Sequence, residues 1–190
     1  MENIMASLIR CKACGYVTVK GKINDVCPAC GVSAKMFEPY QDPVAEKRRK
    51  ILGLHIHPII VHFPQSFSFT LFVLAVLSFV APPQINGVLN CTMQVISSVL
   101  PFSLILALLT GLVDGKTRFR SVTTPFLKKK IIFGLSFLFT SILIAAAAFL
   151  LRLSSAPVMA LFTMLTIIAV GFSIALGLIG SELMEAKFPG

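Results

Sequence analysis

Four of the five cysteines lie in two pairs whose spacing is typical of a metal site. Each pair has the form Cys-x-x-Cys, and twelve residues separate the pairs. Four thiolates around one ion give the tetrahedral arrangement that suits zinc or a single iron. The sequence therefore predicts one metal site with the ligands Cys11, Cys14, Cys27 and Cys30. The competing interpretation, two disulfides, requires an oxidising compartment, and nothing in the sequence indicates one.

A glycine follows the second cysteine of each pair. Gly15 and Gly31 allow a backbone turn that points amides at the sulfurs, where they stabilise thiolates. A module of about 35 residues has too little apolar core to fold alone. We therefore expect the bound metal to supply much of its folding energy.

All three histidines fall within eight residues, at the start of a long apolar segment. Pro58 is the expected first residue of a helix, which leaves His55 in solvent and His57 in the cap region. His62 is expected about one turn inside the helix. His57 and His62 are about 140° apart around a regular helix, so they cannot clamp one haem from it.

Two carboxylates end other apolar segments. Asp114 lies in LLTGLVDG and Glu182 lies in GLIGSEL. Ionisable groups at the ends of membrane helices are candidates for function. The candidate ligands for haem b or a second metal are therefore His57, His62, Asp114 and Glu182, with helix capping and interfacial ion pairs as the alternative.

These groups must be positioned by membrane helices, because the chain is 56% hydrophobic and only 13% charged. A run of about 20 apolar residues spans a bilayer as a helix. Four such runs are present, and they predict spans at residues 58–81, 88–113, 130–152 and 157–184. The expected fold class is an all-α membrane protein with four transmembrane helices and a small metal-binding module.

Changes in composition divide the chain into three expected parts. Residues 1–40 form the metal-binding domain, residues 41–54 a basic linker, and residues 55–190 the transmembrane domain. The N-terminal MENIMASLIRC lacks the apolar core of a signal peptide.

Positive charge predicts the orientation of the helices. KRRK precedes the first span, and six Lys or Arg residues lie between the second and third spans. By the positive-inside rule, both termini face the cytoplasm of a multi-pass protein of the inner cell membrane. The net charge of +9 thus indicates membrane orientation, and no nucleic-acid partner is expected. The cysteines then lie in a reducing compartment, which suits metal-binding thiolates.

The cysteine segment resembles the short rubredoxin-like domain found at the C-terminal end of rubrerythrins. The similarity covers residues 10–38 and includes CKACGYV, the spacer, CPACG and AKMFE. The resemblance implies that the four cysteines hold one iron that carries a single electron. Zinc ribbons share the cysteine pattern, so zinc is the alternative metal.

The apolar part is similar to a family of small four-helix bacterial membrane proteins with a His-Pro…His-Phe-Pro signature and no characterised activity. The similarity rests on HPIIVHFP, LLTGLVDG, LLR and GLIGSEL. It implies the four-helix architecture and draws attention to the same histidines and carboxylates. Members often carry a further histidine before the third helix, where this chain has PFLKKKIIFG. That difference weighs against a metal or haem site that needs the extra ligand.

Two functions follow from these features. The first is a membrane-anchored electron-transfer protein that passes single electrons between a cytosolic four-cysteine iron centre and a haem, a quinone or a partner redox protein. The second is a zinc-ribbon binding or assembly module anchored by the helices. No nucleotide loop, nucleophile motif or paired carboxylates indicate an enzyme, so no catalytic residue is assigned. A homo-oligomer would offer a second histidine to a haem.

Overall fold

The structure is a computed structural model, and it describes residues 8–41, 45–151 and 153–185. The chain divides into two compact units, and the boundary falls between Glu46 and Lys47. Small parts of all three expected regions lie outside the described residues: residues 1–7, 42–44, 152 and 186–190.

The N-terminal unit is a small antiparallel sheet with two cysteine-bearing loops. Its elements are β1 (Leu8–Cys11), β2 (Val17–Val19), the short 3-10 helix η1 (Ala34–Met36) and β3 (Phe37–Tyr40). The strand order is β2-β1-β3, so β1 pairs with both neighbours. Among the described residues of this unit, only Cys11 and Cys27 are buried. The unit therefore lacks an apolar core of its own, as expected for a fold organised around a metal.

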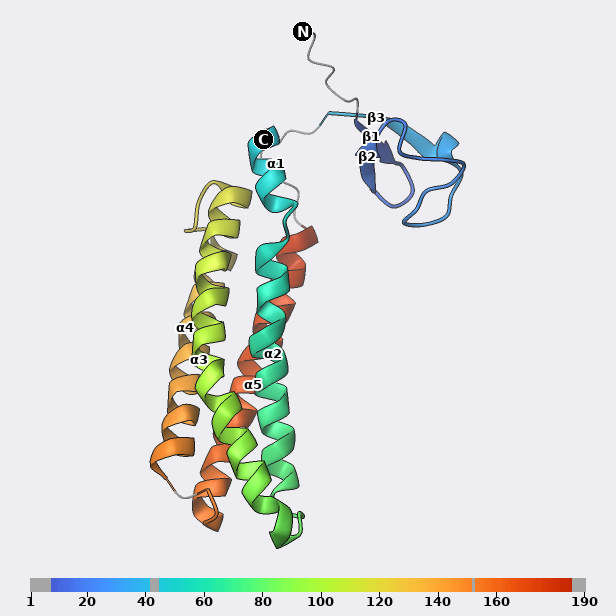
Figure 1. The fold of residues 1–190 in the computed structure, drawn as a ribbon. Coiled ribbons are helices and arrows are strands. Elements are labelled where there is room, and N and C mark those ends of the chain that lie inside the picture. Colours follow the sequence, from blue (N-terminus) through green and yellow to red (C-terminus); the bar gives the residue numbers. More distant parts are fainter. Residues whose placement is uncertain (1–7, 42–44, 152, 186–190) are drawn as a thin grey trace. The chain divides into compact units, whose positions relative to one another are not determined.

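The second unit is a closed bundle of four long helices preceded by a short one. Its elements are α1 (Glu46–Leu52), α2 (Ile56–Leu77), α3 (Pro83–Phe119), α4 (Pro125–Leu150) and α5 (Ala156–Glu185). Helices α2 and α4 each pack against α3 and α5, so the four helices form a ring (Figure 1). Successive helices run antiparallel, as short connections require. All four are long and apolar enough to cross a membrane, which confirms the predicted fold class.

The helices extend beyond several of the predicted spans. Helix α3 begins five residues before the predicted span and ends six residues after it, and α4 begins five residues early. Pro83 and Pro125 explain the early starts, because a proline in the first turn loses no hydrogen bond there. Thr124 caps α4 by accepting a hydrogen bond from the Leu127 amide. The apolar runs marked only the hydrocarbon-spanning part of each helix, whereas the polar ends continue the helix outside it.

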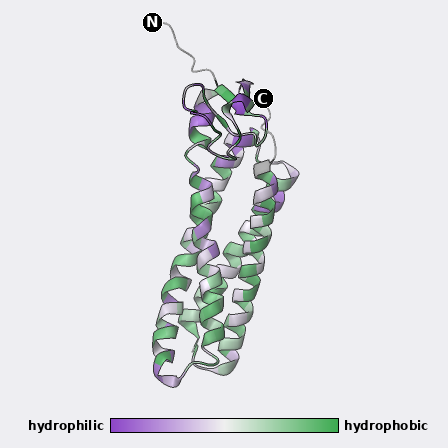
Figure 2. Cartoon of the chain, turned by 90° about the vertical axis from the view of Figure 1, so that its right-hand side faces the viewer, coloured by the Kyte–Doolittle hydropathy of each residue, from purple (hydrophilic) through white to green (hydrophobic). Residues whose placement is uncertain are grey.

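Apolar side chains fill the bundle and also cover its outside. The fully buried core includes Leu71, Met93, Leu100, Phe137, Ile144 and Phe162. Large apolar side chains face outward as well; Phe102 is 68% exposed and Phe139 is 63% exposed. Hydrophobic residues dominate the length of the four long helices (Figure 2). An apolar outer surface of this kind fits lipid rather than water.

One end of the bundle carries its positive charge. Every lysine and arginine of the bundle within the described residues lies where α2 and α4 begin and α3 ends: Lys47, Arg48, Arg49, Lys50, Lys116, Arg118, Arg120, Lys128, Lys129 and Lys130. We call this the basic end. Such asymmetry is the sequence basis of the expected orientation, in which the basic end faces the cytoplasm.

The expected linker contains a helix that is attached to the bundle. In α1, Arg48 donates hydrogen bonds from its guanidinium to the Thr117 carbonyl (2.9 Å) and the Arg118 carbonyl (3.1 Å). These carbonyls belong to the last turn of α3, where no backbone amide of the helix remains to bind them. A cation also interacts favourably with the negative end of the helix dipole. Arg48 therefore caps α3 and fixes α1 against it.

Replacing Arg48 by alanine is expected to destabilise α1 and the last turn of α3. The loss of this cap should cost about 1 kcal/mol locally, or roughly a fivefold increase in amide exchange rates. Hydrogen exchange of α1 and of the last turn of α3, measured in nanodiscs, tests this. Lys47→Ala is the control, because Lys47 is exposed and lies one residue away. Equal rates in the two variants would contradict the capping role.

Candidate functional site

The four predicted cysteine ligands meet at one point. Their sulfur atoms all lie within 4.8 Å of one another. Cys11 Sγ lies 3.9 Å from Cys30 Sγ, and Cys14 Sγ lies 3.8 Å from Cys27 Sγ. A tetrahedral ion with metal–sulfur bonds of about 2.3 Å requires sulfur–sulfur separations of about 3.8 Å. The sulfurs are therefore spaced for one tetrahedral metal ion.

Each cysteine loop places one sulfur inside and one outside. Cys11 and Cys27 are buried, whereas Cys14 and Cys30 are exposed. Gly15 and Gly31 both adopt φ of +77°. Their amides donate to the carbonyls of the first cysteine in each loop, at 2.9 Å in both cases. The left-handed turn expected at the two glycines is therefore present, and a residue with a Cβ would be strained in it. The amides of the glycines themselves bind carbonyls rather than sulfurs.

The surroundings of the sulfurs favour a bound cation. Desolvation opposes ionisation of Cys27, but hydrogen bonds from the Ala29 and Cys30 amides and from neighbouring thiols lower its pKa to about 7. The Val32 amide favours the Cys30 thiolate, yet the crowded thiols and desolvation raise the pKa of Cys30 to about 12. Several thiolates cannot coexist at this distance without a positive ion between them. Zinc or iron would supply that charge and would be held by all four cysteines.

The N-cap of α2 is one of the three histidines, but not the one that was expected. His55, not His57, is the N-cap residue, with a left-handed φ of 50°. His55 is exposed, as predicted. His57 lies inside the helix, because α2 begins at Ile56 rather than at the expected Pro58. His62 is exposed on α2 and points away from the sector that His57 occupies.

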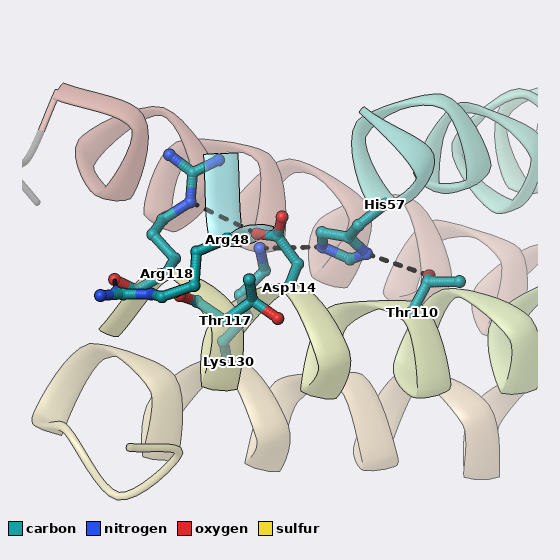
Figure 3. Close-up of polar contacts among 7 residues, drawn as sticks. All are labelled: Arg48, His57, Thr110, Asp114, Thr117, Arg118 and Lys130. Carbon is teal, nitrogen blue, oxygen red and sulfur yellow. Dashed lines mark hydrogen bonds and ion pairs between the residues drawn. The ribbon is translucent and has the colours of Figure 1, made fainter. Parts of the chain in front are cut away.

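His57 links three helices of the bundle through both ring nitrogens. Its Nδ1 lies 3.3 Å from Thr110 Oγ1 on α3, and its Nε2 lies 3.3 Å from Lys130 Nζ on α4 (Figure 3). The ring packs closely on Gly111, where an added Cβ would lie 2.9 Å from His57 Cε1. We call His57, Thr110 and Lys130 the polar triad. It lies at the basic end of the bundle.

The two predicted carboxylates are not brought together with the histidines as ligands. Asp114 pairs with Arg118 of the same helix at 3.4 Å, and Glu182 on α5 is exposed. Within the described residues, no other group of His, Cys, Asp or Glu matches the four cysteines as a potential metal cluster. A haem or second metal at His57, His62, Asp114 and Glu182 stays a prediction, and the ion pair at Asp114 matches the alternative.

The residues that complete this region were not singled out from the sequence. Lys130 and Arg48 were included only among the positive charges that predict orientation, and Thr110 carried no expected role. A weak signal exists at Lys130, the last of three adjacent lysines at the start of an apolar helix. The first two are exposed, and Lys130 is the one turned toward the bundle interior. Only the packing of α4 against its neighbours selects which lysine contacts His57.

Replacing Cys27 by serine is expected to abolish metal binding and to unfold the N-terminal unit, because a buried ligand is lost and no apolar core remains. Metal content per chain and amide protection of β1–β3 test this. Cys91→Ser is the matched control, since Cys91 is an exposed cysteine of the bundle outside the cluster. Retention of one ion per chain in the Cys27 variant would contradict the four-ligand site.

Metal affinity should rise with pH. The metal-free Cys30 thiol, with a pKa of about 12, keeps its proton at neutral pH, whereas a bound metal requires the thiolate. Each proton released gives about a tenfold rise in the association constant per pH unit. Below about pH 7, Cys27 must also lose a proton, so the slope should steepen there. Zinc titration against a chelating dye at several pH values tests this, and a flat profile would contradict it.

Comparison with known proteins agrees with the geometry of the metal site. Residues 10–38 match the family described as "Rubrerythrin, rubredoxin-like domain". No curated protein and no solved structure shows a significant match to the chain. The predicted similarity of the apolar part to the His-Pro…His-Phe-Pro family stays a prediction. Residues 10–38 therefore form a rubredoxin-like domain with a four-cysteine metal site, followed in the same chain by four helices able to span a membrane.

Proposed function

We propose that the protein is a membrane-anchored electron carrier. In this proposal the four cysteines hold one iron, which passes single electrons to or from a membrane-side acceptor: a haem, a quinone or a partner redox protein. The observation that carries the proposal is the tetrahedral set of sulfurs within a segment that matches a rubredoxin-like domain. Iron bound by four thiolates performs one-electron chemistry, with a potential tuned by amide hydrogen bonds to the sulfurs.

The exposure of two sulfurs supports this proposal. Cys14 and Cys30 are exposed, so a redox partner can approach the ligands of the ion directly. Cys11 and Cys27, by contrast, are buried. A purely structural zinc site does not require exposed ligands, although it tolerates them.

The membrane part of the proposal rests on the charge distribution of the bundle. The basic end supports an orientation with both termini in the cytoplasm and a location in the inner cell membrane. The metal domain then works on the cytoplasmic side, in a reducing environment that keeps its thiols free. A soluble one-electron centre gains from such an anchor only if one of its partners is confined to the membrane.

An absorption spectrum of the full-length protein in mild detergent tests the proposal. With one iron per chain we expect a red ferric protein that bleaches with dithionite and recovers in air. Cys91→Ser should keep the colour and Cys27→Ser should lose it. A colourless protein with one zinc per chain would defeat the proposal and favour the zinc-ribbon assembly module. An additional absorption band from a haem would identify haem as the acceptor.

A further inference from the structure

We propose that the polar triad binds the headgroup of a membrane quinone, with Lys130 as the donor to a quinone oxygen. This inference rests on the proposed electron transfer and names the acceptor. It begins from the cost of ionisable groups at membrane depth, which bundles retain at functional sites. Lys130 belongs to an apolar helix able to span the membrane, and its amine lies within hydrogen-bond distance of His57 (Figure 3).

The hydrogen bonds of the triad have one consistent direction. Thr110 donates its hydroxyl proton to the Leu106 carbonyl at 2.8 Å, so its oxygen is free to accept from His57 Nδ1. His57 Nε2 then accepts from the Lys130 ammonium. An ammonium has three protons, and the hydrogen bond to His57 uses one of them. No other acceptor for Lys130 is found among the described residues, so it retains donors for a ligand.

The charge around the triad favours a ligand that becomes negative. Among the side chains that the structure describes, Lys130, Arg118 and Arg48 are cations at this end, and Asp114 is an anion that pairs with Arg118. Asp114 and Arg118 are only 23% and 10% exposed, so water screens this excess of positive charge incompletely. A quinone gains a negative charge with its first electron. A donor of single electrons therefore needs an acceptor site with a positive field.

Helix α5 carries two glycines beside these donors, so a Cβ would fit at either position without a clash. A Cβ added at Gly180 would meet only Lys130 Nζ, at 3.8 Å, and one added at Gly177 would meet only Gln65 Nε2, at 3.5 Å. The inner side of α5 thus presents no side chain at either position, while an amine and an amide face it from α4 and α2. Both groups donate hydrogen bonds, and the two carbonyl oxygens of a quinone accept them.

The triad suits a quinone better than a haem. Both ring nitrogens of His57 are engaged, and an ammonium occupies the lone pair of Nε2 that iron would need. Reduction of a quinone to its quinol consumes two electrons and two protons. Two protein molecules, each with one ferrous centre, supply one electron each and become ferric, and water supplies the two protons through Lys130 at the basic end. The step is therefore balanced by components that the proposal names.

Quinone binding to the zinc-loaded full-length protein tests the site without any electron transfer. The probe is decylubiquinone, and the readout is its retention by protein-loaded nanodiscs of neutral lipid relative to empty ones. We expect Lys130→Gln to weaken binding at least tenfold. Lys129→Gln, which changes an exposed lysine one residue away, should leave it unchanged. Gly180→Leu should also block binding, because it fills the space but keeps every charge.

Three outcomes would overturn the inference. The first is binding that persists in both the Lys130 and Gly180 variants, and the second is equal loss in Lys129→Gln. The third, measured in parallel nanodiscs that contain phosphatidylglycerol, is loss of phosphatidylglycerol retention rather than quinone retention in Lys130→Gln. The last result would identify a site for anionic lipid. Thermal unfolding of each variant shows whether the bundle remains folded. Should Lys130→Gln fail to fold, the Gly180 variant decides alone.

The iron-loaded protein separates this inference from the proposed function. After reduction with dithionite, ferricyanide should oxidise wild type and Lys130→Gln alike, whereas decylubiquinone should oxidise only wild type. If ferricyanide oxidises the protein but no quinone binds, the electron-carrier function is supported and the acceptor is not a quinone at this site. If the protein binds quinone but never holds iron, the quinone site is supported and the proposed electron-transfer function is wrong.

Discussion

The lack of water in the hydrocarbon layer of a bilayer is the constraint on which most of this structure depends. Backbone amides and carbonyls there must bind each other, so the chain crosses as helices. The same constraint keeps the described lysines and arginines of the bundle at one end. It also favours hydrogen bonds among polar groups that enter the bundle. His57, Thr110 and Lys130 form a continuous chain across three helices.

The N-terminal unit has a different constraint, because it has almost nothing apolar to bury. Cys11 and Cys27 are its only buried residues within the described range. The free energy that a larger domain gains from its core must come here from metal–sulfur bonds. Stability and chemistry therefore share the same four side chains, and no substitution at them separates the two.

Helix α1 shows how a short connection becomes part of a fold. A charged segment between two units has the composition of a linker, and residues 41–54 were predicted to be a basic linker. Seven of these residues instead form a helix, and Arg48 binds the last carbonyls of α3. The helix end needs donors and the arginine needs acceptors, so each satisfies the other.

Local spacing was enough for the metal ligands and for the number of membrane helices. Two Cys-x-x-Cys pairs place their sulfurs through tight local turns, and a run of apolar residues reports a span regardless of its neighbours. Helix ends were less predictable, because prolines and polar residues extend α3 and α4 beyond the apolar runs. The contacts of His57 could not be predicted, since they depend on the rotation of α3 and α4 about their axes. That rotation is set by packing among helices far apart in sequence, and only the tertiary structure decided that Lys130, rather than Lys128 or Lys129, meets the histidine.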